Sequence, residues 1–408
     1  PLFPLGVAAV ILFVFVSFRN IEHGLIILVF SMLLSPELKI AKVPGRDVVI
    51  RFDDLILISL FVVRLTQMAI KKELGLFTKT PINLPIFIYT LICILFTARG
   101  IVIGTVVFKK AIFYLLKYTE YFMLFLITVS IVKTKEELIR LLIAALITFV
   151  IVCIHGYSLL GKVARLYAPF DYTPGVAVTT GESATLGGYL LIVMSVLLAT
   201  FCYAPSAKIA ILSIGSFLFC LIPFAYTLSR ASFFGFVPMY LLTVILSQKK
   251  KLALTVGLVV GLFFAPILFP KPVEDVKNRI QETFAGSEEE KEVILGFKIR
   301  ELSAIARIKT WKNAFTKWIP QQPLMGFGVT GVGLGDTQFP LVIGELGLIG
   351  FACFLWLIFS VGKNALKIFY TIDNWLAKAL SQGLFCALIA LLFQSVAVNT
   401  FIIIRIME

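Results

Sequence analysis

Apolar segments long enough to cross a bilayer recur along almost the whole chain, and this repetition restricts the fold more than any other feature of the sequence. A hydrocarbon core about 30 Å thick requires roughly 20 apolar residues per helix. About twelve segments meet or approach that length, and they cover residues 2–17, 22–35, 54–70, 84–98, 111–132, 138–160, 184–203, 209–226, 231–247, 252–269, 341–362 and 379–404. None alternates as the strands of a membrane barrel do, so we expect helices.

The composition supports the same class of fold. Of 408 residues, 59% are hydrophobic and 15% charged, and the mean hydropathy is +0.99, which excludes a soluble globular domain. We predict an all-α polytopic membrane protein with transmembrane helices over 1–269, a large helical periplasmic loop over 270–340 and transmembrane helices over 341–408. The first two spans are short enough to form a tilted or interfacial pair. The sequence begins at Pro1 and ends directly after an apolar run, so we expect a further helix at one end or the other.

The formal charge of +14 is spread over many short loops, with no basic block of the kind that binds nucleic acid. Anionic lipid head groups explain it, and so does an anionic lipid-linked substrate. If the loop at 271–340 is external, alternation places Arg46, Arg99, Arg165 and Arg230 on the same outer side. Positive residues normally accumulate inside, so these arginines favour an anionic substrate at the outer face. The six cysteines all lie in apolar spans without paired spacing and are expected to be core residues.

Charged residues at the edges of spans have mostly structural interpretations. Asp53 and Asp54 precede the third span, where they are expected to cap a helix; a metal-binding role is the less favoured alternative. Lys117 and Glu120 lie three residues apart in the fifth span and are expected to pair within the membrane.

Two arginines are the first candidates for chemistry. Arg230, in TLSRASFFGF, has almost no loop around it, so its charge lies at or below the membrane surface, where an ionisable group is costly; the alternative is an arginine that reaches the lipid head groups. Arg307 lies in SAIARIKTWKNAFTKW, whose residues Ala304, Ile308, Trp311 and Phe315 predict an apolar helix face. Guanidinium groups suit diphosphates because their donors bind in pairs.

Other candidates follow from residue type and position. The glycine run GFGVTG at 326–331 formally matches a dinucleotide fingerprint, but it does not follow a strand, so a mobile loop beside a membrane cavity is the favoured interpretation. Asp336, after this run, is either a helix cap or a general base. His155, near the end of the sixth span, is either a core histidine or a base or ligand. His23 is expected at the interface.

The segments TLSRAS, RIKTWKNAF, PLMGFGVTG and DTQFPLVIGELGLIG, in this order, resemble the O-antigen ligase and polysaccharide polymerase superfamily of bacterial GT-C-like membrane glycosyltransferases. The resemblance covers about residues 54–404 and is most specific over 226–350. It implies transfer of a glycan from undecaprenyl diphosphate to a glycan or glycolipid acceptor at the periplasmic face of the inner membrane. It implies neither a metal nor another cofactor, and no nucleic-acid partner; membrane lipids surround the protein.

The resemblance also implies roles for individual residues. Arg230 and Arg307 match the arginines that hold the donor diphosphate, and Lys309, on the helix of Arg307, is a further candidate for substrate binding. Arg165 and Gly181, with fifteen residues between them, resemble an arginine–glycine spacing in external loops of the polymerases. Asp336 is expected to orient or deprotonate the acceptor. His155 and Glu182 are further candidates for substrate contact.

One departure from the family pattern decides between its members. Ligases usually carry a histidine about nine residues before the ELG element, and this chain has Asp336 and Thr337 there, before Glu345. A polymerase is therefore favoured, and a ligase that attaches glycan to lipid A core is the alternative. A lipid-linked oligosaccharide flippase is the competing class, although its charges should line the whole path through the bilayer rather than gather at one face.

Overall fold

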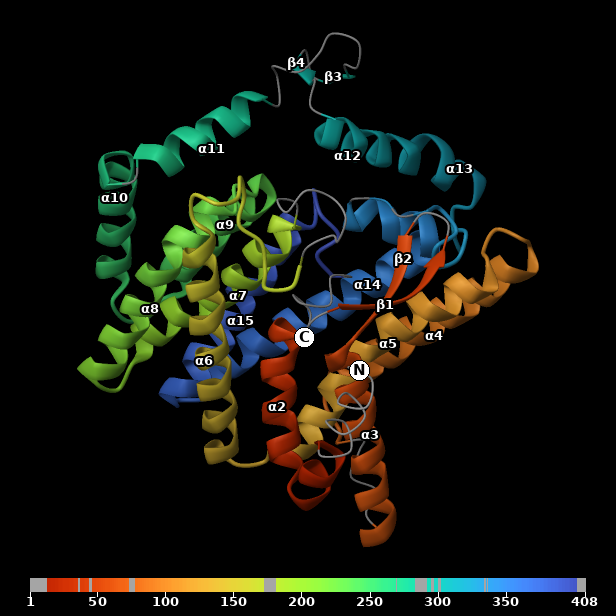
Figure 1. The fold of residues 1–408 in the computed structure, drawn as a ribbon, viewed down its shortest axis with the longest axis horizontal. Helices are drawn as coiled ribbons and strands as arrows, with labels where there is room; N and C mark the ends of the chain where they lie inside the picture. Colours follow the sequence, from red (N-terminus) through yellow and green to blue (C-terminus); the bar gives the residue numbers. More distant parts are fainter. Residues whose placement is uncertain are drawn as a thin grey trace. The chain divides into compact units, whose positions relative to one another are not determined.

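The computed structural model describes residues 13–35, 37–43, 46–72, 78–171, 181–268, 270–282, 292–294, 297–299, 302–333, 335 and 337–401. Packing divides the chain into two units. Unit 1 contains residues 1–80 and 116–182, and unit 2 contains residues 81–115 and 183–406. Helix α5 (Phe108–Ile131) carries the chain from unit 2 into unit 1 (Figure 1). The division of the chain by hydropathy at residues 270 and 341 stays a prediction.

Unit 1 is built from α2 (Ile21–Leu34), α3 (Phe52–Lys71), α6 (Lys135–Leu159) and the second part of α5. Its helices start at side-chain caps: Asn20 accepts from Glu22 N, and Thr134 and Glu137 form a capping box at α6. The core is aliphatic where α2, α3 and α5 meet, and its fully buried members include Leu25, Leu28, Leu57, Leu60 and Ile127.

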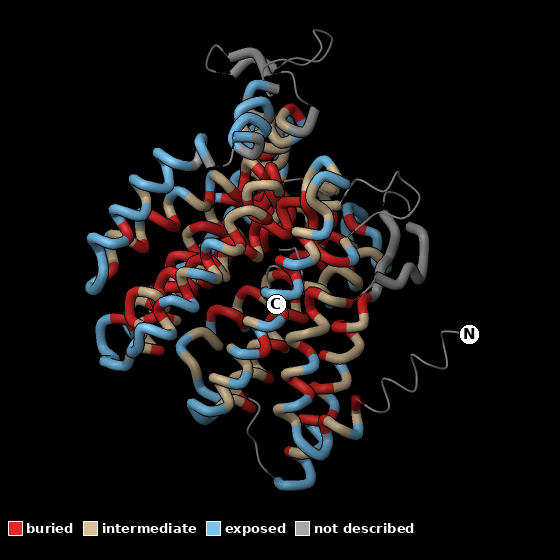
Figure 2. The backbone as a smooth tube through the Cα atoms, turned by 60° about the vertical axis from the view of Figure 1, so that its left-hand side comes forward, coloured by how far each residue is buried: buried red, intermediate tan, exposed pale blue. Residues whose placement is uncertain are grey.

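Unit 2 holds most of the long apolar helices. They are α4 (Asn83–Val102), α7 (Ser183–Tyr203), α8 (Ala207–Tyr226), α9 (Arg230–Leu246), α10 (Lys251–Leu268), α14 (Gln338–Thr371) and α15 (Trp375–Gln394). Helix α15 packs against α7, α9 and α14. Buried positions lie where the helices meet, and exposed positions lie on the outer faces (Figure 2).

Small residues let the central helices of unit 2 approach closely. A Cβ atom added to Gly235 of α9 would lie 2.5 Å from the carbonyl oxygen of Ala390 in α15. One added to Gly383 of α15 would lie 2.8 Å from Cα of Val196 in α7. Close contact between backbones is the usual way in which membrane helices associate, because lipid removes the hydrophobic driving force between them.

Seven of the described helices are long and apolar enough to cross a membrane: α4, α5, α6, α7, α8, α14 and α15. Helices α2 and α9 and the stretch 251–264 are apolar but shorter. These findings support a polytopic membrane protein, while a total of twelve spans stays a prediction. The expected last span, 379–404, is not one continuous helix, because α15 ends at Gln394 and the chain then forms turns as far as Phe401.

The described chain is predominantly helical, as the sequence predicted, and two short strand pairs accompany the helices. Strands β1 (Glu37–Val43) and β2 (Arg46–Arg51) form an antiparallel pair before α3. The large hydrophilic interval contains α11 (Pro270–Glu282), a second pair β3 (Glu292–Ile294) and β4 (Phe297–Ile299), and then α12 (Leu302–Asn313). A π-helical turn, η1 (Ala314–Trp318), and the short α13 (Ile319–Gln321) follow.

Candidate functional site

Helix α14 is broken at Gly347, inside the ELG element. Gly347 has φ 64° and ψ −169°, a conformation that glycine adopts without strain. A break in a helix leaves backbone groups without partners on both sides, and the loop at 323–328 supplies them. Phe327 N donates to Gly344 O at 2.9 Å and Gly328 N to Glu345 O at 2.8 Å, and Leu348 N donates to Pro323 O at 2.9 Å.

The same loop is fixed from its other side by α4. Arg99 donates through Nη1 to Gly326 O at 3.1 Å and through Nη2 to Gln322 Oε1 at 2.7 Å. Val329 N donates to Thr97 Oγ1 at 3.1 Å. The glycine run is therefore bonded to two helices, and our expectation of a mobile loop is wrong for residues 326–331. Its glycines serve close backbone contact: a Cβ atom on Gly326 would lie 2.6 Å from Glu345 O.

A buried carboxylate lies at this junction, and the residue patterns did not single it out. Glu345 is 3% exposed, and its Oε1 accepts a hydrogen bond from Thr330 N at 2.6 Å. Thr330 has a positive φ of 70°. Glu345 thus holds a strained turn of the glycine loop, a structural role that rests on a tertiary contact.

Arg230 is the first residue of α9. The turn from α8 has only three residues, Thr227 to Ser229, as its position between two apolar spans predicted. Ser229 is the N-cap and accepts from Ser232 N at 3.4 Å. The free N–H groups of a helix start attract anions, so an arginine at this point adds its own donors to a position that already favours negative charge.

The start of α9 is tied to the starts and ends of other helices in unit 2. Gln394, the last residue of α15, donates through Nε2 to Ser232 Oγ at 3.1 Å and to Ala184 O, in the first turn of α7, at 2.9 Å. Gln394 is completely buried. These bonds place the N-termini of α7 and α9 and the C-terminus of α15 at one end of unit 2.

Helix α12, which carries Arg307, is bonded to the same end. Trp311, one turn after Arg307, donates from its indole Nε1 to Val396 O at 3.1 Å. Val396 follows Gln394 by two residues. A short chain of contacts therefore connects the helix of Arg230 to the helix of Arg307 through the C-terminal end of α15, and the structure brings these two predicted residues to one end of one unit.

The predicted apolar face of α12 is only partly correct. Ile305 is 3% exposed and Ala314 is completely buried, whereas Phe315 is 58% exposed. The π-helical turn η1 explains the difference, because its i to i+5 bonding shifts the residues after Asn313 around the axis. Lys309 is exposed.

Asp336, the predicted base or cap, lies outside the described residues. Its neighbours are described. Thr337 is the N-cap residue of α14. Gly335 accepts a hydrogen bond on its carbonyl oxygen from Nδ2 of Asn399, in the turns after α15.

The remaining predicted residues, His155, Arg165, Gly181 and Glu182, belong to unit 1. His155 is half-buried in the last turns of α6. Arg165 is half-buried in the following loop, and Glu182 is exposed. Gly181 is required by packing, because a Cβ atom there would lie 2.2 Å from Asp171 O. The structure therefore gives this glycine a steric role.

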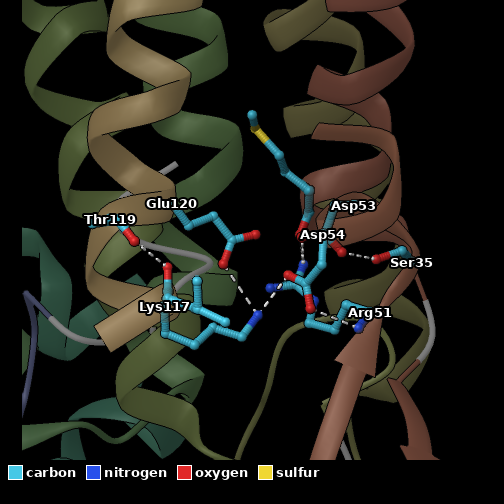
Figure 3. Close-up of polar contacts among 9 residues, drawn as sticks. Ser35, Arg51, Asp53, Asp54, Lys117, Thr119 and Glu120 are labelled. Carbon is cyan, nitrogen blue, oxygen red and sulfur yellow. Dashed lines mark hydrogen bonds and ion pairs between the residues drawn. The ribbon is translucent and has the colours of Figure 1, made fainter. Parts of the chain in front are cut away.

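Unit 1 also contains a buried network of charged side chains that the sequence revealed only in part (Figure 3). Lys117 Nζ lies 3.2 Å from Glu120 Oε2, which confirms the predicted pair, and 2.6 Å from Asp54 Oδ1. Asp54 also accepts from Arg51 N at 2.9 Å, so its capping role is confirmed. Asp53 instead pairs with Arg51 at 2.8 Å and accepts from Ser35 Oγ at 2.6 Å.

The opposite end of unit 2 is basic. Lys250 donates to Phe201 O, in the last turn of α7, at 2.8 Å. Lys378 lies 2.8 Å from Asp373, and its hydrogen bond lowers the pKa of that exposed carboxyl group. Across the part of the chain that the structure describes, no three His, Cys, Asp or Glu side chains are arranged to hold a metal ion.

The chain was compared with protein-family models and with curated proteins. No protein-family model matches the chain. A search of curated proteins also finds no match.

Proposed function

We propose that this protein is a membrane glycosyltransferase that uses an undecaprenyl-diphosphate-linked glycan as donor and a glycan as acceptor. The observation that carries the proposal is the placement of Arg230 and Arg307 at one end of unit 2, connected through Ser232, Gln394 and Trp311. The resemblance of the surrounding segments to the O-antigen ligase and polymerase superfamily supplies the substrate class.

The reaction that fits this arrangement is a displacement with inversion at the anomeric carbon. A hydroxyl oxygen of the acceptor forms the new bond to that carbon, and the bond from the carbon to the diphosphate oxygen breaks. The diphosphate leaves with the electron pair, and the hydroxyl proton passes to a base, for which Asp336 is the candidate. Arg230 and Arg307 stabilise the charge that develops on the leaving diphosphate.

The energetic share of each arginine follows from comparable groups. Loss of one preorganised donor to a developing oxyanion costs about 3 kcal/mol of transition-state stabilisation, which corresponds to a rate lower by roughly a hundredfold. Arg230→Lys should also lose activity, because an ammonium group does not offer the paired donors of a guanidinium.

The proposal places the site at the periplasmic face of a bacterial inner membrane. The charged groups of unit 2 support one-sided chemistry: the helices of the two arginines are connected to the first turn of α7, and the basic residues Lys250 and Lys378 lie at its other end. A flippase would need charged groups along the path between these ends.

The test uses purified protein in lipid with undecaprenyl-diphosphate-linked repeat units, in the presence of a chelator and without nucleotide sugars. We expect a ladder of longer glycans on a gel, and its loss in Arg307→Ala. Lys312→Ala is the matched control, because this exposed residue lies on the same helix. A single larger product that requires lipid A core would identify a ligase. Absence of any product, with transfer of the lipid-linked sugar across the bilayer, would contradict the proposal.

A further inference from the structure

Large apolar side chains are exposed at the end of unit 2 that carries the glycine loop. Some belong to the turn between α4 and α5, and others follow α12 in the hydrophilic interval, within η1 and just after α13. Exposed apolar side chains that gather on one surface usually mark a contact with a membrane or a protein. The set that we call the apolar rim consists of Val102, Val107, Phe108, Phe315, Leu324 and Met325.

Hydrogen bonds hold the two parts of the apolar rim together. Arg99, in the last turn of α4, donates to Gln322 Oε1 at 2.7 Å and to Gly326 O at 3.1 Å. The rim residues after α13 lie between these two acceptors. Thr105, in the turn after α4, donates through Oγ1 to Phe327 O at 2.8 Å. Gln322 N in turn donates to the carbonyl oxygen of the last residue of η1 at 2.9 Å, so η1 is tied to the same place.

These bonds fix the depth of the apolar rim relative to a membrane. Helix α4 is long and apolar enough to cross a bilayer and ends at Val102, so its last turn is expected at the boundary between hydrocarbon and head groups. An arginine in that turn extends toward the head groups. The segment bonded to Arg99 therefore lies at the same depth, although it belongs to the hydrophilic interval. Apolar side chains exposed at this depth face lipid.

The charge around the apolar rim is positive. Residues 83–119 and 302–335 contain no aspartate or glutamate. Lys109 and Lys317, which are exposed, and Lys110, which is half-buried, lie within two residues of Phe108 or Phe315. Lysines beside a bilayer surface are attracted to anionic head groups. The first part of the interval, residues 271–292, is rich in glutamate instead, so this charge match is confined to the second part.

We propose that the apolar rim docks into the membrane–water interface, with its apolar side chains among the upper acyl chains and Lys109, Lys110 and Lys317 on anionic phospholipid head groups. Exposed aromatic and aliphatic residues beside lysines are typical of interfacial segments. The inference goes beyond the proposed function and does not depend on it, because it requires only that α4 crosses the membrane. It gives the second part of the hydrophilic interval a membrane-bound position.

The test places a nitroxide spin label on the apolar rim, at Leu324→Cys, in full-length protein in lipid nanodiscs. Val273→Cys is the matched control, because this exposed valine lies in α11, beside the acidic Glu274. The labelled wild type corrects for the six native cysteines. One set of nanodiscs contains phosphatidylcholine alone, and the other also contains phosphatidylglycerol. Electron paramagnetic resonance measures collisions of the label with oxygen, which concentrates in lipid, and with a water-soluble nickel chelate.

We expect the label at Leu324 to collide mainly with oxygen and the label at Val273 mainly with the chelate. The ratio of docked to undocked label at Leu324 should rise with phosphatidylglycerol. In those nanodiscs, Lys109→Gln, Lys110→Gln and Lys317→Gln should lower it by about fivefold for each lysine removed, with an unchanged melting temperature.

Two results at Leu324 would overturn docking into lipid. A label that collides mainly with the chelate in both nanodiscs would place the rim in water, and a label shielded from both probes would place it against protein, such as a second copy of the chain. A docked ratio that responds neither to phosphatidylglycerol nor to the lysine substitutions would overturn the assignment of anionic head groups.

Discussion

Gln394 donates to Ser232 through Nε2 at 3.1 Å, and this bond joins the last residue of α15 to the first turn of α9. Arg230 lies two residues before Ser232, and Val396, which accepts from Trp311, lies two residues after Gln394. A single buried amide therefore connects the supports of both arginines. We therefore expect the relative position of the two guanidinium groups to depend on this amide.

Substitution of Gln394 should reduce glycan transfer by more than the accompanying loss of folding stability can explain. Gln394→Leu removes two hydrogen bonds and should lower the free energy of unfolding by about 1–3 kcal/mol, with a large loss of glycan transfer. Gln382→Leu is the control. This completely buried glutamine lies within α15, away from the arginines, and donates to Thr243 O of α9 at 3.1 Å. It should lose similar stability and keep its transfer rate, as measured by thermal unfolding and the gel assay. Equal activity in the two variants would show that Gln394 has only a packing role.

The break in α14 should tolerate no side chain. In Gly347→Ala, a Cβ atom would lie 2.3 Å from Leu324 O at a residue with positive φ, so the loop at 323–328 must move away. We expect a loss of about 1–3 kcal/mol from the backbone conformation alone, because a positive φ with ψ near 180° is open essentially to glycine only. Gly215→Ala, at an open position in helix α8, should leave the unfolding temperature equal or higher. An unchanged unfolding temperature in Gly347→Ala would contradict the described contact.

The charge network of unit 1 should be sensitive to loss of its ammonium group. Lys117→Met leaves Asp54 and Glu120 buried without their shared partner, and we expect a loss of about 3–5 kcal/mol. Adding Glu120→Gln to this variant should restore part of the lost stability, because one fewer buried negative charge then lacks a partner. Arg140→Ala breaks an exposed pair with Glu22 and should leave the free energy of unfolding nearly unchanged. Similar losses in the Lys117 and Arg140 variants, measured by chemical denaturation, would show that burial does not strengthen the network.

The two ends of unit 2 should lie on opposite sides of the membrane. Lys250 is bonded to the last turn of α7, whereas α12 is connected through α15 to the first turn. Lys309→Cys should therefore react with an impermeant maleimide added to intact cells, and Lys250→Cys should react only after the cells are opened. The reverse pattern would place the arginines in the cytoplasm and exclude a periplasmic site.

Local features of the fold could be predicted from the sequence. The pairing of Lys117 with Glu120 and the capping by Asp54 depend on residues three apart in one helix or turn, and helical spacing is enough to find them. The helix boundaries near Arg230 follow from hydropathy for the same reason. Strand β1 also had a signal that we did not use, since apolar Leu38 and Ile40 alternate with charged neighbours in ELKIAKV.

Features that depend on distant contacts could not be predicted. The glycine run appeared mobile because its composition is flexible, but Arg99 and Thr97 in α4 hold it in place. Glu345 and Gln394 were missed because a buried polar residue in an apolar span shows no role until its partner is known. The π-helical turn after Asn313 has no signal in the residue pattern, and it displaces Phe315 from the apolar face that regular helical spacing predicts.

The most direct test of the central claim is a double-mutant cycle on undecaprenyl diphosphate binding, with Arg230→Gln, Arg307→Gln and the variant that combines them. If both guanidinium groups hold the same diphosphate, each single change should weaken binding by about 1.5–3 kcal/mol, and the combined loss should differ from the sum of the single losses by more than about 1 kcal/mol. Losses that add to within about 0.5 kcal/mol, or single changes that leave binding unaltered, would contradict a shared diphosphate site.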